Sequence, residues 1–213
     1  MPYSVKEIFY TLQGEGAQVG RPAVFCRFEG CNLWSGRELD RPTSVCKFCD
    51  TDFKGTDGPG GGCFETPEAL AAAVAEKFPP KKTEDPKPLV VCTGGEPLLQ
   101  MDGALISAFH NLGFEIAIET NGTFSAPEGI DWICVSPKAG SQVQQRFGNE
   151  LKLVFPQDGL DPGEWESLDF TFFFLQPQDG PELTKNTRLA VDYCLKHPRW
   201  RLSLQMHKYI GIH

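Results

Sequence analysis

Six short apolar runs, separated by segments of helical or polar character, most strongly constrain how this chain can fold. The runs cover residues 23–28, 88–93, 114–120, 131–136, 150–155 and 170–176. Several are apolar at successive positions, which is typical of parallel strands that are covered on both faces. The intervening residues 66–78, 97–113 and 183–197 have the periodicity and end residues of helices. This alternation predicts an α/β domain of mostly parallel strands.

Length and charge narrow the class further. A chain of 213 residues can hold one full core, and no internal repeat divides it, so we expect a single domain spanning residues 1–213. The formal net charge of −8 argues against a nucleic-acid partner, because phosphate binding needs clustered Lys and Arg. The first residues lack the features of a secretory signal, and no apolar run approaches the roughly 20 residues of a membrane helix. We therefore expect a cytoplasmic protein without a membrane partner.

Polar residues stand where four of the predicted strands end. In chain order they are Thr93, Gly94, Gly95 and Glu96; Glu119, Thr120 and Asn121; Ser136 and Lys138; and Gln176, Gln178 and Asp179. The carboxyl ends of parallel strands meet at one edge of a sheet, where ligands bind. Strand ends are commonly polar, but two adjacent glycines would let backbone amides approach a ligand, and Glu96 could hold an ammonium group.

Three of the eight cysteines are grouped: Cys31, Cys46 and Cys49 form a C-x14-C-x2-C pattern. In a reducing compartment such a group indicates metal binding or catalysis rather than disulfides. The remaining cysteines are dispersed, and we expect them to be small buried hydrophobic residues. They are Cys26, Cys63, Cys92, Cys134 and Cys194.

The number of ligands distinguishes two kinds of metal site. A structural zinc site wants four protein ligands, and the four histidines include no pair at zinc-finger spacing. Cys26 is a possible fourth ligand, but it lies inside a predicted strand, which favours core packing. If only three thiolates bind a 4Fe–4S cluster, one iron has no protein ligand and is open to chemistry. We favour this second arrangement.

The cysteine pattern, the Gly-Gly-Glu-Pro after the next strand, the Ser-Pro-Lys and the late Gln-containing strand end resemble the radical S-adenosylmethionine superfamily. Most of its members carry C-x3-C-x2-C. The longer first interval resembles the 7-carboxy-7-deazaguanine synthase family, some of whose members carry C-x14-C-x2-C. The segments "IFYTLQGEGAQVGRPAVFCRFEGCNLW" and "CDTDF" also resemble that family. The resemblance implies a partial (β/α) barrel of the radical S-adenosylmethionine type with an enlarged cluster loop.

The same resemblance assigns the cofactor site. Cys31, Cys46 and Cys49 would hold a 4Fe–4S cluster, and S-adenosylmethionine would chelate the fourth iron. Further residues would pack against or orient S-adenosylmethionine: Phe48, Gly94, Gly95, Glu96, Ser136, Pro137, Lys138, Gln176, Pro177, Gln178 and Asp179. For Phe48, ordinary core packing is the alternative.

The resemblance also implies the reaction. A radical derived from S-adenosylmethionine would take a hydrogen from 6-carboxy-5,6,7,8-tetrahydropterin, which would lose ammonia and contract to 7-carboxy-7-deazaguanine, a precursor of queuosine. The residues that would bind the pterin are Leu12, Gln13, Gly14, Glu15, Arg27, Thr93 and the terminal His213, which stands where the family pattern has Pro. Arg27 suits the substrate carboxylate because its guanidinium can make a two-pronged contact; a surface ion pair is the alternative.

Three residues remain with chemical roles. Thr51 matches the position of a ligand to Mg²⁺, an ion that keeps several non-protein oxygens. Glu119 and His207 are candidates for moving protons during ammonia loss, with a structural hydrogen bond as the alternative for each.

Two other functions remain open from the sequence. One is a radical enzyme that activates a glycyl-radical partner protein, and the other is a zinc-stabilised binding module without catalysis. Family analogy further implies a flavodoxin-like electron donor and a homodimer.

Overall fold

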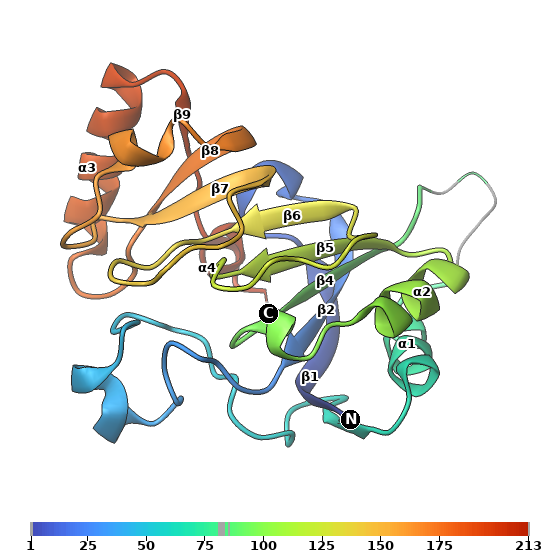
Figure 1. The fold of residues 1–213 in the computed structure, drawn as a ribbon. Coiled ribbons are helices and arrows are strands. Elements are labelled where there is room, and N and C mark those ends of the chain that lie inside the picture. The colour runs from blue at the N-terminus through green and yellow to red at the C-terminus, as the bar shows by residue number, and fades with distance from the viewer. Residues whose placement is uncertain (1, 81–83, 85, 213) are drawn as a thin grey trace.

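The computed structural model describes residues 2–80, 84 and 86–212. Within these residues nine strands form one sheet in the order β3-β1-β2-β4-β5-β6-β7-β8-β9 (Figure 1). β1 is antiparallel to both of its neighbours, and every other neighbouring pair is parallel. The strands are β1 (Tyr3–Leu12), β2 (Pro22–Phe28), β3 (Gly62–Phe64), β4 (Leu89–Gly94), β5 (Glu115–Thr120), β6 (Trp132–Val135), β7 (Phe147–Phe155), β8 (Asp169–Pro177) and β9 (Trp200–Leu202).

All six predicted strands are present, as β2 and β4 to β8. Both faces of the central strands are covered, which explains their unbroken apolar sequences. In β4, Val90 and Cys92 belong to one buried cluster, whereas Leu89 and Val91 belong to another. The predicted α/β fold with mostly parallel strands is therefore confirmed. The sheet is consistent with a partial barrel because β3 and β9 stand at opposite ends of the strand order and do not pair with each other.

Four α-helices and four short 3₁₀ helices lie among the described residues. They are α1 (Pro67–Ala75), α2 (Gly103–Asn111), α3 (Leu183–Lys196) and α4 (Met206–Ile210), with η1 (Gly16–Gln18), η2 (Glu38–Thr43), η3 (Pro97–Leu99) and η4 (Pro162–Trp165). α1 and α3 match two of the predicted helices, and the Thr66 hydroxyl accepts a hydrogen bond from Ala69 N at the start of α1, as expected of an N-cap.

The predicted helix over residues 97–113 is wrong in its first part. η3 covers Pro97–Leu99, and α2 begins only at Gly103. The Asp102 carboxylate accepts a hydrogen bond from Leu105 N at 2.9 Å and so caps a new helix at this point. Two short helical pieces therefore replace one long helix.

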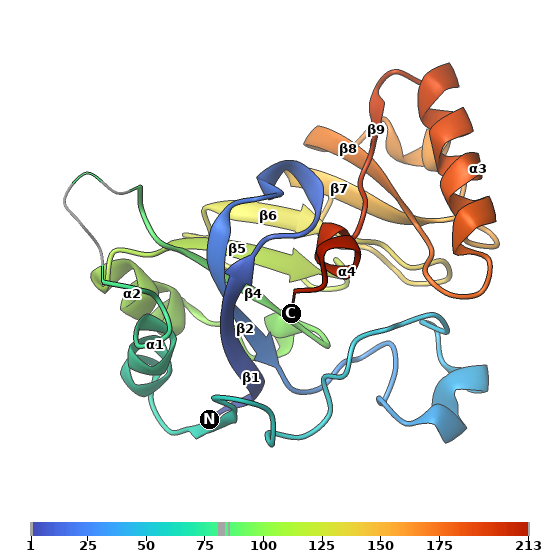
Figure 2. The same ribbon diagram turned by 180° about the vertical axis from the view of Figure 1, so that it is seen from behind.

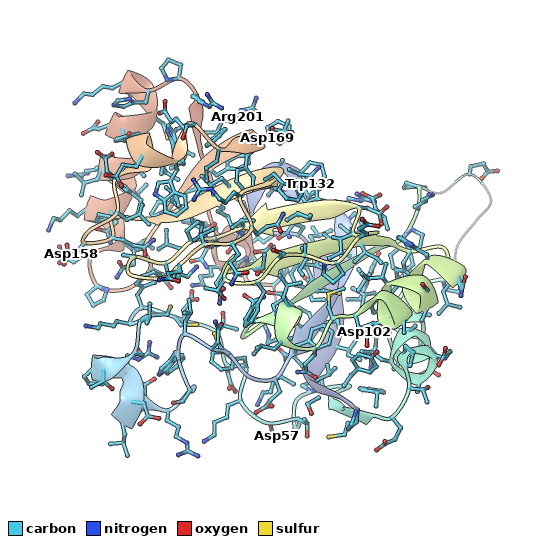
Figure 3. The ribbon with its side chains drawn as sticks, in the orientation of Figure 1. Asp57, Asp102, Trp132, Asp158, Asp169 and Arg201 are labelled. Carbon is cyan, nitrogen blue, oxygen red and sulfur yellow. The ribbon has the colours of Figure 1, made fainter. Side chains whose placement is uncertain are left out.

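The helices cover the sheet at two places (Figure 1). α1 and α2 lie at one end and share a buried cluster with β1, β2, β4 and β5. α3 lies at the other end and packs on β7 and β8 in a second cluster. Figure 3 shows Trp132 and Asp169, where β6 and β8 begin, on one side of the sheet, and Asp158 beyond the carboxyl end of β7 on the other.

The prediction that the dispersed cysteines are buried is only partly correct. Cys26, Cys92 and Cys134 are buried, but Cys194 is half-buried and Cys63 is exposed. Cys63 lies on β3, a strand of three residues at the edge of the sheet, where its side chain has no covering layer. No helix in the described part of the chain is long and apolar enough to cross a membrane.

Candidate active site

A cavity of about 520 Å³ lies where the carboxyl ends of the parallel strands face the loop that carries the grouped cysteines. Its wall includes Thr93 from β4, Glu119 from β5, Lys152 from β7 and Gln176 from β8. Residues of β1 and β2, the loop after β1, the cysteine segment, the segment after β6 and the chain around α4 also line it. Seen from behind, α4 lies beside the loop that follows β1 (Figure 2). The predicted convergence of strand ends on one site is thus confirmed.

The turn at the end of β4 anchors the cysteine segment to the sheet. Gly95 N donates to Phe28 O at 3.2 Å, and Glu96 N donates to Gly30 O at 2.8 Å, immediately before Cys31. Gly94 has a φ of +127°, a conformation that favours glycine. These two amides are engaged by the chain itself. Close backbone packing against Phe28 and Gly30 requires glycine at both positions, and the approach of a ligand to them stays a prediction.

The three grouped cysteines lie on the wall of the same cavity. Cys46 is buried and packs with Leu33, Trp34 and Phe53, while Cys31 and Cys49 are half-buried against this cluster. A hydrogen bond between the thiols of Cys46 and Cys49 raises the pKa of Cys46 and lowers that of Cys49. Burial raises the pKa of the Cys31 thiol. The three thiols thus lie together in a partly buried region at the cavity wall.

The donor set fits a cubane iron–sulfur cluster. Among the described residues, no three His, Cys, Asp or Glu side chains are close enough together to surround a single metal ion. A cubane cluster does not need three side chains around one metal ion, because each thiolate binds a different iron of the cluster. Three thiols and an adjoining cavity would leave one iron accessible. Thr51 also lies on the cavity wall, which is where a hydroxyl ligand to Mg²⁺ would have to be.

Glu96 lies behind the cavity wall and is fully buried. Its carboxylate accepts hydrogen bonds from Asn121 N at 2.8 Å, Thr120 Oγ1 at 2.7 Å and Leu98 N at 3.0 Å. Burial raises the pKa of Glu96, although these three donors oppose that rise. The carboxylate therefore joins the end of β4 to the end of β5 in this structure. The assignment of Glu96 to an ammonium group of S-adenosylmethionine stays a prediction.

The segment after β6 brings a cation close to the cysteines. Lys138 Nζ donates to Ser136 O at 2.6 Å and to Ser136 Oγ at 2.8 Å. The charge of Lys138 also lowers the pKa values of Cys46 and Cys49, although the hydrogen bond between the two thiols has the larger effect on each. A lysine in this place can offset the negative charge of thiolates or attract a ligand carboxylate.

A carboxylate on β1 pairs with a guanidinium on β2 at the cavity wall. The register pairs Glu7 with Arg27 and Arg27 with Thr93 across three adjacent strands, and all three residues line the cavity. The Arg27 Nε donates to Glu7 Oε1 at 2.7 Å, and both side chains are largely buried. Glu7 therefore fixes the plane of the guanidinium. Arg27 thus forms an ion pair, as the alternative supposed, but the pair is largely buried on the cavity wall, and binding of a substrate carboxylate stays a prediction.

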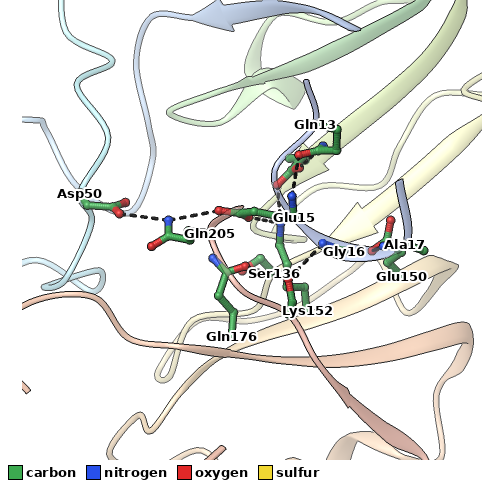
Figure 4. Close-up of polar contacts among 12 residues, drawn as sticks. Gln13, Glu15, Gly16, Ala17, Asp50, Ser136, Glu150, Lys152, Gln176 and Gln205 are labelled. Atoms are coloured by element: carbon green, nitrogen blue, oxygen red, sulfur yellow. Dashed lines mark hydrogen bonds and ion pairs between the residues drawn. The ribbon is translucent and has the colours of Figure 1, made fainter. Parts of the chain in front are cut away.

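The short C-terminal helix is tied to the same loop. Met206 N donates to Gly14 O at 2.9 Å, and the His207 imidazole lies so close to Gly14 that a Cβ added there would overlap it. Gln205 Nε2 donates to Glu15 Oε1 at 3.1 Å and to Asp50 Oδ2 at 3.3 Å (Figure 4). Gln205 thus links the loop after β1 to the cysteine segment.

Most of the predicted site residues meet at this cavity. Those on its wall are Leu12, Gln13, Gly14, Glu15, Arg27, Cys31, Cys46, Phe48, Cys49, Thr51, Thr93, Gly94, Gly95, Glu119, Ser136, Lys138, Gln176, Pro177, Asp179 and His207. Glu96, Pro137 and Gln178 are not among the lining residues. His213 lies outside the described residues.

Sequence reasoning missed several residues of the wall. They include Lys152, whose side chain is almost fully buried. They also include Gln205 and Lys208, which come from the chain around α4. Lys152 stands in the predicted strand "ELKLVF", where a lysine between two leucines was the available signal. A lysine is almost never fully buried unless it is paired, so that position should indicate a buried partner.

The fold and the cavity define the class first: an α/β protein with a mostly parallel sheet and a site at the carboxyl ends of its strands. The crystal structure of QueE from Escherichia coli has a similar fold, with a TM-score of 0.71 and 28% identity over 97% of this chain and 95% of that chain. A scan against models of known protein families finds no match.

Similarity to known proteins then identifies the family. The chain is 63% identical over 213 residues to the 7-carboxy-7-deazaguanine synthase of Caulobacter vibrioides, with 100% of both proteins covered. It is 42% identical over 212 residues to the synthase of Bacteroides thetaiotaomicron, again with 100% of both covered. The chain belongs to the 7-carboxy-7-deazaguanine synthase family. The resemblance that the sequence motifs indicate is confirmed.

Proposed function

We propose that this protein is a radical S-adenosylmethionine lyase that converts 6-carboxy-5,6,7,8-tetrahydropterin to 7-carboxy-7-deazaguanine with loss of ammonia. The single observation that carries the proposal is the meeting, in one cavity, of three cysteines with the Gln13–Glu15 loop and Arg27. Full-length similarity to proteins that bear the synthase name supports the same reaction. The described chain then acts as one domain.

Cys31, Cys46 and Cys49 would hold the 4Fe–4S cluster, because they are the thiols that reach the cavity wall. When bound, the cluster and S-adenosylmethionine supply the radical that removes a hydrogen atom from the substrate. Lys138 and Ser136 would orient the carboxylate and ribose of S-adenosylmethionine, and the cavity would keep water from the reacting atoms.

Arg27 would bind the substrate carboxylate, since Glu7 presents its guanidinium in a fixed plane. Gln13, Gly14 and Glu15 would contact the pterin ring from the loop after β1. Glu119 and His207 flank this loop and would carry protons during ammonia loss: Glu119 accepts a hydrogen bond from Gln13, and His207 lies against Gly14.

Three finer features complete the proposal. Thr51 would contribute its hydroxyl to a Mg²⁺ ion that also contacts the substrate carboxylate. A flavodoxin-like protein would deliver the electron, and two copies of the chain would associate as a homodimer. These features follow from the family resemblance.

Product analysis tests the reaction. The anaerobically reconstituted protein is incubated with S-adenosylmethionine, the carboxylated tetrahydropterin and a reductant, and the products are identified by mass spectrometry. We expect both 5′-deoxyadenosine and 7-carboxy-7-deazaguanine from the unaltered chain and from Cys63→Ala, which changes an exposed cysteine outside the cavity. Cys49→Ala should form neither.

Two outcomes would contradict the proposal. Deoxyadenosine without a ring-contracted product would indicate a different radical enzyme. A colourless protein that holds zinc and forms no product would indicate a binding module without catalysis.

A further inference from the structure

Lys152 is a buried cation that neither the motifs nor the proposed roles explain. It lies on β7, and its side chain is only 4% exposed. Its Nζ donates to Glu119 Oε2 at 2.7 Å and also to Glu15 Oε2. One ammonium group therefore joins the end of β5 to the loop after β1.

The contacts close into a ring of four residues. Gln13 Nε2 donates to Glu119 Oε1 at 3.0 Å. Glu15 N donates to Gln13 Oε1 at 3.1 Å (Figure 4). Lys152 completes the ring through the two carboxylates. Both carboxylates line the cavity, so the ring holds groups that lie on the cavity wall.

The ring contains two carboxylates and one ammonium group, so acidic groups outnumber basic ones. Burial favours the neutral form of Lys152, but the attraction of Glu119 and Glu15 outweighs it and raises the pKa of Lys152 well above its ordinary value. Burial likewise raises the pKa of Glu15, but Lys152, Gln205 and His207 together lower it. Glu150 and Cys134, on β7 and β6, also face this lysine. Asp50 reaches the ring only through Gln205.

Packing alone does not account for a lysine here. A well-packed apolar residue of similar volume is often as stabilising as a buried ion pair, or more so. The hydrogen bonds of Lys152 go to two groups that face the cavity, rather than to a distant part of the core. The arrangement therefore points to control of those two groups.

We propose that Lys152 is a positioning residue, which holds the carboxylates of Glu15 and Glu119 in one fixed arrangement on the cavity wall. This inference rests on the proposed function, because it concerns how the pterin and the proton-carrying carboxylate meet. Lys152 acts through Glu15 and Glu119, whose carboxylates accept the hydrogen bonds of its ammonium group.

The test compares the unaltered enzyme with Lys152→Met, Lys152→Arg and Lys185→Met. Lys185 makes an exposed ion pair with Glu182 and serves as the matched control. For each, kcat and KM are measured over a range of pH, and substrate binding is measured by calorimetry without S-adenosylmethionine. We expect Lys152→Met to lower kcat about 100-fold, the loss typical of a group misplaced by about 1 Å.

The pH profile separates positioning from a general structural defect. In Lys152→Met the two carboxylates face each other without a cation, so the pKa of Glu15 should rise and the loss of activity should be larger on the acidic side. Lys152→Arg should recover much of kcat and restore the profile of the unaltered enzyme. Lys185→Met should match the unaltered enzyme throughout.

Lys152→Met/Glu15→Gln covers the case in which the single variant fails to fold. This double variant removes one cation together with one anion and therefore keeps the net charge of the ring. It should fold and still lose kcat.

Specific results would overturn the inference. One is a Lys152→Met enzyme with unchanged kcat and pH profile. Another is a loss of kcat in Lys152→Met that is the same at every pH and that Lys152→Arg shares. Full activity of a folded double variant would also overturn it. An unaltered enzyme that forms no product would instead overturn the proposed function itself.

Discussion

Gly14 has no room for a side chain, because the imidazole of His207 lies directly against it. The two residues are far apart in the sequence, and Gly14 O accepts a hydrogen bond from Met206 N, next to His207. The glycine thus sets where a candidate proton carrier stands. Sequence motifs indicated both residues as parts of the site, but the packing between them needed the structure.

Gly14→Ala should therefore displace His207 and lower kcat by at least about tenfold, since the added methyl group takes the place of the ring. The free energy of unfolding should change little, because α4 is short and largely exposed and can shift. Steady-state kinetics and urea denaturation measure the two effects. Gly103→Ala, at a helical position with open space around it, is the control and should lose nothing in either. Unchanged kcat in Gly14→Ala would contradict this account of His207.

Glu96 illustrates what a motif cannot tell at the level of single residues. The sequence Gly-Gly-Glu-Pro predicts a carboxylate that can hold an ammonium group, and the structure adds three hydrogen bonds that its oxygens accept from the chain. Two of those donors belong to Thr120 and Asn121, more than twenty residues further along the chain. Only the tertiary arrangement brings them to Glu96.

Glu96→Gln should lower the free energy of unfolding by about 1 to 3 kcal/mol, because the amide NH₂ cannot accept from Asn121 N. Denaturation in urea gives this quantity. Glu128→Gln, at a site for which no such bonds are found among the described residues, should change the stability little. Equal stability of Glu96→Gln and the unaltered protein would show that the buried carboxylate is not structural.

At the scale of elements, apolar runs predicted the parallel strands well and the outer strands poorly. β1 alternates polar and apolar residues and has a bulge between Val5 and Glu7, so it lacks the continuous pattern of the central strands. β3 and β9 have three residues each, too few for a pattern. α4 has five residues and no capping side chain, so its position near the cavity could not be inferred from the sequence.

α4 is held against two other elements by one lysine. Lys208 Nζ forms ion pairs with Asp50 in the cysteine segment and with Asp179 after β8. These partly exposed pairs contribute little to overall stability, but they bridge segments distant in the chain.

Lys208→Met should therefore loosen α4 and the cysteine segment together, without unfolding the sheet. Hydrogen–deuterium exchange should be faster in residues 46–53 and 204–212 and unchanged in β4 and β5. Lys185→Met, which breaks an exposed pair within α3, should leave both segments unaffected. Exchange that is faster only in α4 would contradict a bridging role.

At the scale of the whole molecule, the ring around Lys152 makes stability depend on pH. The folded-state pKa of Glu15 lies below its ordinary value of 4.5, so its contribution is present above pH 4.5 and is lost as the pH falls through the lowered value. The folded-state pKa of Lys152 lies above 10.5, so its contribution is present below pH 10.5 and is lost at higher pH.

Lys152→Met should accordingly lower the free energy of unfolding by about 3 to 5 kcal/mol at neutral pH, because it leaves buried carboxylates without a cation. The difference from the unaltered protein should shrink as the pH falls well below 4.5, where Glu15 is protonated. Urea denaturation over a pH series measures it. A difference that is constant with pH would contradict an ionic origin.

The account depends most on an iron that no side chain binds. Cys26, the only other candidate ligand considered, is fully buried in the core beside Cys92 and is not part of the cavity wall. The most direct test is electron paramagnetic resonance of the reduced, anaerobically reconstituted protein with and without S-adenosylmethionine, alongside its iron content. We predict about four irons per chain and a spectrum that changes when S-adenosylmethionine is added, in the unaltered protein and in Cys26→Ala alike. A cluster whose spectrum is indifferent to S-adenosylmethionine would contradict the account.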